Sequence, residues 1–270
     1  MRTFLLSFAL LCIAGPIVAQ EARTSTYAQL LMRDCERYHG GDRERFCEIR
    51  DVPLRAPEHS LFVDGQENGS VTIYGWDKNE VLVRAIVQTW ADTRGDAEAL
   101  AKEIKIETDG DRVRSDGPLD RRHTSWTVNY EVWVPRRTNL EADTHNGGVS
   151  VEGVEGRMEL RSVNGGIALR QAAGDIRART TNGGVTAYLD GQTWRGAGLD
   201  LATRNGGVVL EIPRGYSAEL ETGTVSGSMT IDFPINVQGD IGRRINTKLG
   251  NGGPRVRAIT TSGGVKIRER

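Results

Sequence analysis

Acidic side chains are the residues of this 270-residue chain whose type would best support catalysis. Sugar-cleaving sites need two carboxylates at a fixed separation, and calcium sites need several grouped oxygen ligands. The acids near a series of repeated turns stand at different distances from those turns and alternate with arginines; they are Asp143, Glu152, Glu155, Glu159 and Asp175. This pattern is typical of a solvated wall of mixed charge, and it predicts no catalytic pair.

No other motif indicates a metal or a cofactor. The segment 108–111, Thr-Asp-Gly-Asp, resembles the start of a calcium loop, but the third carboxylate and the distal glutamate are missing, so a hairpin turn is expected. The four histidines, His39, His59, His123 and His145, never pair at the spacing of metal ligands. Nucleophile-elbow, phosphate-loop and dinucleotide motifs are also missing from the sequence. We therefore expect no catalytic residue, no metal ligand and no cofactor.

The charge balance argues against nucleic acid as a partner. Lys and Arg number 35 against 36 Asp and Glu, which gives a formal net charge of −1, and the sequence contains no basic run. Binding to phosphates requires clustered basic side chains.

The N-terminus is typical of an export signal. A basic start, residues 1–3, precedes an apolar run from Phe4 to Ala14, and residues 17–19 end in the small residue Ala19. The run is shorter than the ~20 residues that span a membrane, and no later stretch is long and apolar enough to do so. The sequence predicts a signal peptide at 1–19, no transmembrane segment in the mature chain, and a periplasmic or extracellular location.

Two cysteines, Cys35 and Cys47, remain once the predicted signal and its Cys12 are removed. An even pair in an exported chain favours a disulfide. A redox or zinc role is disfavoured because the spacing is not Cys-x-x-Cys and only His39 lies within the loop.

Much of the glycine, 33 residues in all, stands in a repeated turn. Asn-Gly-Gly occurs five times and Ser-Gly-Gly follows in the same series, and mostly apolar residues stand six before and three and five after each turn. This two-residue period predicts a β strand on either side of each turn. The predicted structural turn residues are Asn146, Gly147, Asn164, Gly165, Asn182, Gly183, Asn205, Gly206, Asn251, Gly252, Ser262 and Gly263.

The repeats predict an all-β fold, a β-solenoid of stacked two-strand rungs that share one core. Stacking at ~4.8 Å would place the turn asparagines above one another, where their amides can form a ladder. The short step of 11 residues from Asn251 predicts that Ser262 turns at the opposite corner.

The region before the repeats predicts a wider antiparallel β part. Alternating strands are expected at 81–87, 104–108 and 126–134, with one short helix at 96–103. The expected organisation is a signal peptide at 1–19, a disulfide-bracketed segment at 20–54 and a solenoid domain at 55–270.

The longer step between Asn182 and Asn205 predicts a loop at 190–196. An exposed Trp194 beside Arg195 would suit contact with carbohydrate or protein. A Trp194 folded down over the solenoid wall is the open alternative.

These motifs resemble those of a family of bacterial exported domains, the putative-adhesin family. The resemblance spans about residues 55–268 and rests on Val71–Asp77, Trp133–Pro135, Thr144–Val149, the later Asn-Gly-Gly turns and Ile212–Tyr216. It implies a β-solenoid with a role in the cell envelope or at the surface, and it brings no catalytic residues. The segment with Cys35 and Cys47 lies outside it.

The favoured interpretation is a non-enzymatic, adhesin-like binding protein of the bacterial envelope whose partner is a surface or envelope protein or a glycan. A polysaccharide-active β-helix enzyme, which would require grouped acids, is one alternative. A periplasmic partner in envelope-stress signalling is another.

Overall fold

The computed structural model describes residues 26–37, 42–120, 122–235 and 242–270 of the chain. Two compact units are distinguished, residues 1–37 and residues 38–270. In the first, α1 (Thr26–Arg37) is the described element. The predicted signal peptide lies outside the described residues.

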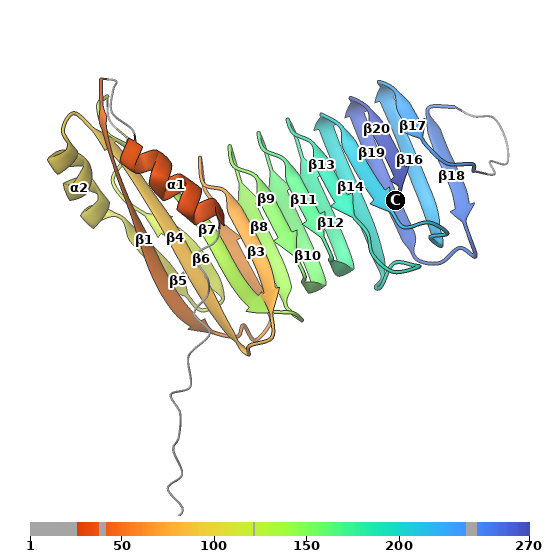
Figure 1. Cartoon of the computed structure of the whole chain (residues 1–270), viewed down its shortest axis with the longest axis horizontal. Helices are drawn as coiled ribbons and strands as arrows, with labels where there is room; N and C mark the ends of the chain where they lie inside the picture. The colour runs from red at the N-terminus through yellow and green to blue at the C-terminus, as the bar shows by residue number, and fades with distance from the viewer. Residues whose placement is uncertain (1–25, 38–41, 121, 236–241) are drawn as a thin grey trace, which may run out of the picture. The chain divides into compact units, whose positions relative to one another are not determined.

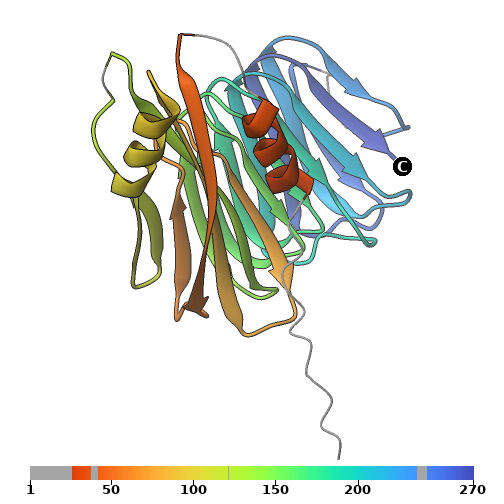
Figure 2. The same ribbon diagram turned by 60° about the vertical axis from the view of Figure 1, so that its left-hand side comes forward.

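The second unit is mostly β, which confirms the predicted class, and it contains two sheets of ten strands each (Figures 1 and 2). Sheet A has the order β1 (Glu44–Arg55), β4 (Glu80–Ala91), β7 (Ser125–Pro135), β3 (Val71–Trp76), β9 (Val149–Glu152), β11 (Ile167–Arg170), β13 (Val185–Tyr188), β15 (Val208–Ile212), β20 (Val265–Glu269) and β17 (Met229–Ile231). Sheet B has the order β18 (Arg244–Leu249), β16 (Ala218–Ser226), β19 (Arg255–Ser262), β14 (Gly198–Asn205), β12 (Ala173–Thr180), β10 (Glu155–Ser162), β8 (Asn139–Thr144), β2 (Ser60–Asp64), β6 (Arg112–Asp116) and β5 (Lys105–Asp109).

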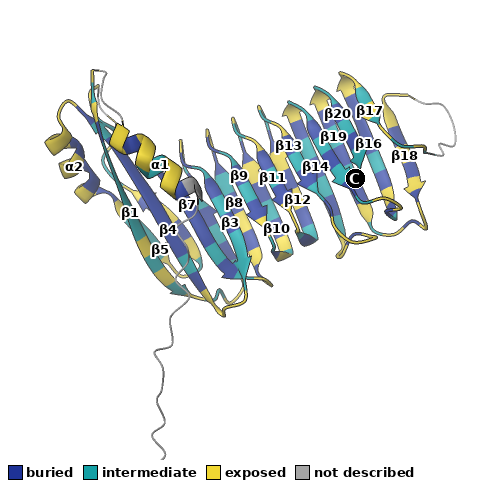
Figure 3. Ribbon diagram, in the orientation of Figure 1, coloured by how far each residue is buried: buried dark blue, intermediate teal, exposed yellow. Residues whose placement is uncertain are grey.

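The chain alternates between the sheets, and successive passes lie parallel and in register. Met158 of β10 faces Ile176 of β12, and Ile167 of β11 faces Val185 of β13, so the 18-residue sequence period becomes one step along each sheet. Alternate residues of every such strand are buried, which places a continuous apolar core between the sheets (Figure 3).

In the N-terminal region β1, β4 and β7 are longer, with 12, 12 and 11 residues, and antiparallel pairs form between β1 and β4, β4 and β7, and β5 and β6. The predicted helix is α2 (Arg94–Glu103), which Thr93 caps by accepting a hydrogen bond from the Asp96 amide. Ala97, Leu100 and the following Ile104 are buried, and α2 packs on β1 and β4. Of the described helices, none is long and apolar enough to cross a membrane.

The order of the last strands differs from simple stacking along the sequence. β19 and β20 lie between the pair β14 and β15 and the earlier pair β16 and β17. The chain reaches that position through β18, which runs antiparallel to β16. The final pass is thus inserted between two earlier ones.

The assignment of Asn251 and Gly252 to the repeated turn is therefore wrong. Both lie in the hairpin between β18 and β19, at the end of the strands opposite the other turns, where Gly250 and Gly252 have φ of 52° and 78°. Ser262, by contrast, stands in register with Asn205. The prediction that Asn251 and Ser262 turn at opposite corners holds.

Candidate binding surfaces

The repeated turns form one edge of the domain, along which the asparagine amides make the predicted ladder. Each amide donates from Nδ2 to Oδ1 of the asparagine before it, over 2.7 to 2.9 Å. We call this set the Asn ladder; its members are Asn68, Asn146, Asn164, Asn182 and Asn205. The first member stands outside the predicted turn set, although Asn68-Gly69 in the sequence already resembled the repeat.

Buried hydroxyls and glycines fix the turns behind the ladder. Ser162 donates to the Gly147 carbonyl at 2.9 Å and Thr180 to the Gly165 carbonyl at 2.7 Å. A Cβ on Gly165 would overlap the Gly147 carbonyl, so only glycine permits this close stacking of the backbone. Ser262 and Gly263 continue the backbone stack, because the Gly206 backbone amide donates to the Ser262 carbonyl. Serine has no side-chain amide, so the amide ladder itself does not extend to Ser262.

The exposed face of sheet B carries a network of ion pairs that crosses six strands. Glu159 pairs with Arg179 at 3.3 Å, Arg179 with Asp200 at 2.8 Å, and Asp200 with Arg257 at 2.7 Å. Arg257 and Arg255 then share Glu221 of β16, and at the other end Arg161 joins Glu159 to Asp143 of β8.

Each acid within this network is matched by arginine. Burial raises the pKa of Glu221, but its hydrogen bond to Arg255 and the charges of Arg255 and Arg257 outweigh burial, so the pKa lies below the usual value. Burial raises the pKa of Asp143, against the opposing charge of Arg161. No group of His, Cys, Asp or Glu among the described residues is placed to hold a metal ion.

The outer face of sheet A carries a row of aromatic and charged side chains at one level of seven neighbouring strands. We call it the outer row; it comprises Trp133, Tyr74, Glu152, Arg170, Tyr188, Glu211 and Arg268. Tyr74 stacks on Trp133 with ring centroids 5.6 Å apart, and the Arg170 guanidinium lies 4.3 Å from the centre of the Tyr188 ring. Arg268 pairs with Glu211 at 3.6 Å.

The loop at 190–196 resolves the alternative left open for Trp194. Its side chain is 4 % exposed and its indole nitrogen donates to the Gly174 carbonyl at 2.9 Å, so it belongs to the core. Arg195 is exposed and lies 3.8 Å from Glu155. Trp194 is therefore unavailable as a surface contact.

Cys35 of α1 and Cys47 of β1 are both disulfide-bonded, in agreement with the predicted bridge. Of the four histidines, His123 lies 3.0 Å from Asp92, and both side chains are more than half exposed.

Two parallel-stacked sheets around one core define a solenoid-like, mostly β protein. The chain belongs to the Toastrack DUF4097 family, whose model matches residues 101–268. No curated protein matches the chain.

Similar solved structures include a "putative cell adhesion protein" from Clostridium sporogenes, 12 % identical over 84 % of this chain and 100 % of that one, with a TM-score of 0.40. A "putative adhesin" from Bacteroides fragilis is 10 % identical over 83 % and 97 % of the two chains, with a TM-score of 0.37. A "putative lipid binding protein" from Parabacteroides distasonis is 9 % identical over 83 % and 96 %, with a TM-score of 0.36. At these values the similarity says nothing about function.

Proposed function

We propose that the chain is a non-enzymatic, adhesin-like binding protein of the bacterial cell envelope, and that the outer row is the surface that contacts a protein or glycan partner. The supporting observation is the row itself: it places aromatic rings and charges of both signs at one level of seven adjacent strands. At a strand spacing of ~4.8 Å it spans about 29 Å. Aromatic and arginine side chains are the types that contribute most to protein contacts.

The stacking that holds the row also favours binding over catalysis. Strands in register keep the side chains of the row at fixed spacing. The surface is therefore preorganised, and little conformational entropy is lost when a partner binds. On the opposite face the acids are matched by arginines, so a free catalytic pair of the kind that polysaccharide cleavage needs is not favoured there.

The bonded cysteines, together with the predicted signal peptide, support an envelope location. The exported chain, cleaved at the predicted site, is the form in which the protein is expected to meet its partner.

A glycan array and a pull-down from envelope extracts test this function. The wild type should capture a protein or glycan that the double variant Arg170→Ser/Tyr188→Ser fails to capture. The matched control Arg157→Ser/Arg177→Ser changes exposed arginines of sheet B and should bind as the wild type does. Blank results for the wild type in both assays would overturn the proposal, and so would equal capture by the Arg170→Ser/Tyr188→Ser variant.

A further inference from the structure

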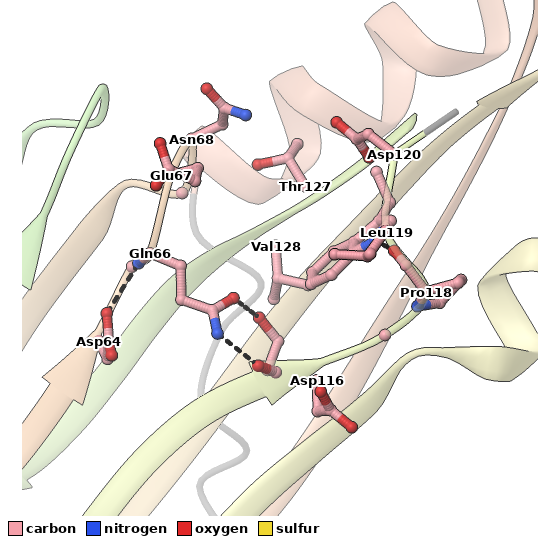
Figure 4. A pocket seen from close by; sticks show the side chains of 15 residues that line it. Asp64, Gln66, Glu67, Asn68, Asp116, Pro118, Leu119, Asp120, Thr127 and Val128 are labelled. Atoms are coloured by element: carbon pink, nitrogen blue, oxygen red, sulfur yellow. Dashed lines mark hydrogen bonds between the residues drawn. The ribbon is translucent and has the colours of Figure 1, made fainter. Parts of the chain in front are cut away.

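A cleft lies beside the first member of the Asn ladder (Figure 4). Its walls come from the end of β2 with the turn after it, residues 64–69, and from the end of β6 with the segment after it, residues 115–120. The first residues of β7, 126–128, complete it. Its volume of about 600 Å³ falls within the ~300–1,000 Å³ of typical ligand sites.

The cleft carries charge of one sign. Four of its fifteen described lining residues are carboxylates, Asp64, Glu67, Asp116 and Asp120, and none of the fifteen is Lys, Arg or His. Asp64 lies 3.9 Å from Arg112. The other three are exposed and have no ion-pair partner within the part of the chain that the structure describes. The cleft therefore favours a cationic ligand.

Apolar side chains lie between the acidic walls. Leu119 is 89 % exposed, and Val128 and the half-buried Trp126 also line the cleft. The Trp126 indole nitrogen donates to the Pro118 carbonyl at 2.7 Å, and a Cβ on Gly117 would stand only 3.1 Å from the ring. The ring is thus held in place, with a hydrophobic surface between separated negative charges.

The two walls are tied together before any ligand arrives. Gln66 donates from Nε2 to the Ser115 carbonyl at 2.6 Å and accepts from the Ser115 hydroxyl at 2.9 Å, as Figure 4 shows by dashed lines. The backbone amide of Gln66 also donates to the Asp64 carboxylate at 2.9 Å. A cleft fixed in this way loses little entropy when it binds.

We propose that this cleft binds an extended segment of another protein that carries lysine or arginine side chains. Long basic side chains can lay their apolar stems on Leu119 and Trp126 and place their charges at the separated carboxylates. The four acids come from two separate segments, 64–67 and 116–120, which fits a ligand whose charges are spaced along a chain. This proposal rests on the proposed binding function and adds to it a class of partner, a protein with a basic extended segment.

The test uses the exported chain and a fluorescein-labelled octapeptide of alternating lysine and leucine, followed by fluorescence anisotropy at low salt. The peptide should bind the wild type, and its affinity should fall as salt rises. Asp116→Asn/Asp120→Asn should weaken binding about tenfold. Leu119→Ser, which leaves the charge unchanged, should weaken binding about threefold.

Glu98→Gln/Glu103→Gln on α2 removes the same charge from exposed positions outside the cleft, and it should bind within about twofold of the wild type. A thermal melt of each variant checks that it is folded.

The proposal is overturned if the wild type does not bind the peptide, if Asp116→Asn/Asp120→Asn binds as the wild type does, or if the α2 control weakens binding equally. If spermine displaces the peptide with an inhibition constant equal to the peptide's own dissociation constant, the proposal is also overturned, and the site is assigned to free polyamines instead. Each of these outcomes leaves capture through the outer row intact, so failure of the cleft is distinguishable from failure of the proposed function.

Discussion

In the repeat region, β8 to β15, each strand lies between parallel neighbours in register, whereas β1 and β4 of the N-terminal region pair antiparallel over twelve residues. In the first region one residue type recurs at the same level of each pass, so the same contact is made again and again. In the second, individual contacts such as the Arg84 pair with Asp51 occur once. The stability of the stacked region therefore depends on a few positions that recur in every pass. Substitutions at those positions test the difference between the two regions.

Val185→Asp should have the largest effect. Val185 is fully buried in the shared core, so the variant would bury an unpaired charge and lose at least about 4 kcal/mol of stability, or fail to fold. Thr186→Asp is the matched control, because the next residue of the strand points to the opposite face. It should cost less than about 1 kcal/mol in denaturant unfolding. Similar losses for the two variants would contradict the assignment of inner and outer faces.

Gly165→Ala should cost about 3 kcal/mol, because the added methyl group would overlap the backbone of the previous pass. In the N-terminal region, Gly95 lies in α2 and has only the Thr93 hydroxyl near the position of a Cβ, at 3.8 Å. Gly95→Ala should therefore be neutral or stabilising by up to about 1 kcal/mol. Melting temperatures of the two variants check this contrast, which fails if both glycines tolerate alanine.

Asn164→Ala should remove two amide hydrogen bonds of the Asn ladder and cost about 1 to 2 kcal/mol. Asn251→Ala should change stability by less than about 0.5 kcal/mol, since only the backbone amide of Asn251 makes a hydrogen bond in the described structure, to Ser217. Denaturant unfolding of the two variants compares the same amino-acid change inside and outside the ladder. An equal cost would mean that the ladder amides do not stabilise the stack.

The same difference between regions decides what could be predicted from sequence. The turns at Asn146, Asn164 and Asn182 recur with one spacing, so their alignment and the amide ladder follow from the strand period. The position of Asn251 does not follow, because the same tripeptide suits a hairpin, and only the antiparallel pairing of β18 shows which turn it makes. The burial of Trp194 could not be predicted from sequence, since it depends on the hydrogen bond to Gly174 of an earlier pass.

The acidic cleft and the order of the ion pairs on sheet B could not be predicted, for a similar reason. The acids of the cleft come from segments about fifty residues apart, which the parallel pairing of β2 with β6 and the Gln66 contact with Ser115 bring together. The ion-pair network leaves a trace in the sequence, because Glu159, Asp200 and Arg257 each stand five residues before a turn. Their order across sheet B could not be inferred, since Arg257 reaches Asp200 only through the inserted β19.

The smallest predicted effect concerns the inserted strand itself and depends on pH. Glu221 of β16 pairs with Arg255 and Arg257 of β19, and its pKa is lowered in the folded chain. A carboxyl whose folded pKa lies below its unfolded value near ~4.3 stabilises the fold above that value, and the contribution is lost as the pH falls through the folded pKa. The wild type should therefore melt above Glu221→Gln at neutral pH, and the difference should shrink below about pH 4.3. Glu48→Gln in β1 is the N-terminal counterpart, since among the described residues Glu48 forms an ion pair only with Arg50 of its own strand. It should show a smaller difference in melting temperature at neutral pH. Because the Glu221 pairs join strands that the chain connects only through β18, a pH-independent difference at Glu221 would mean that packing, and not charge, holds the inserted strand in place.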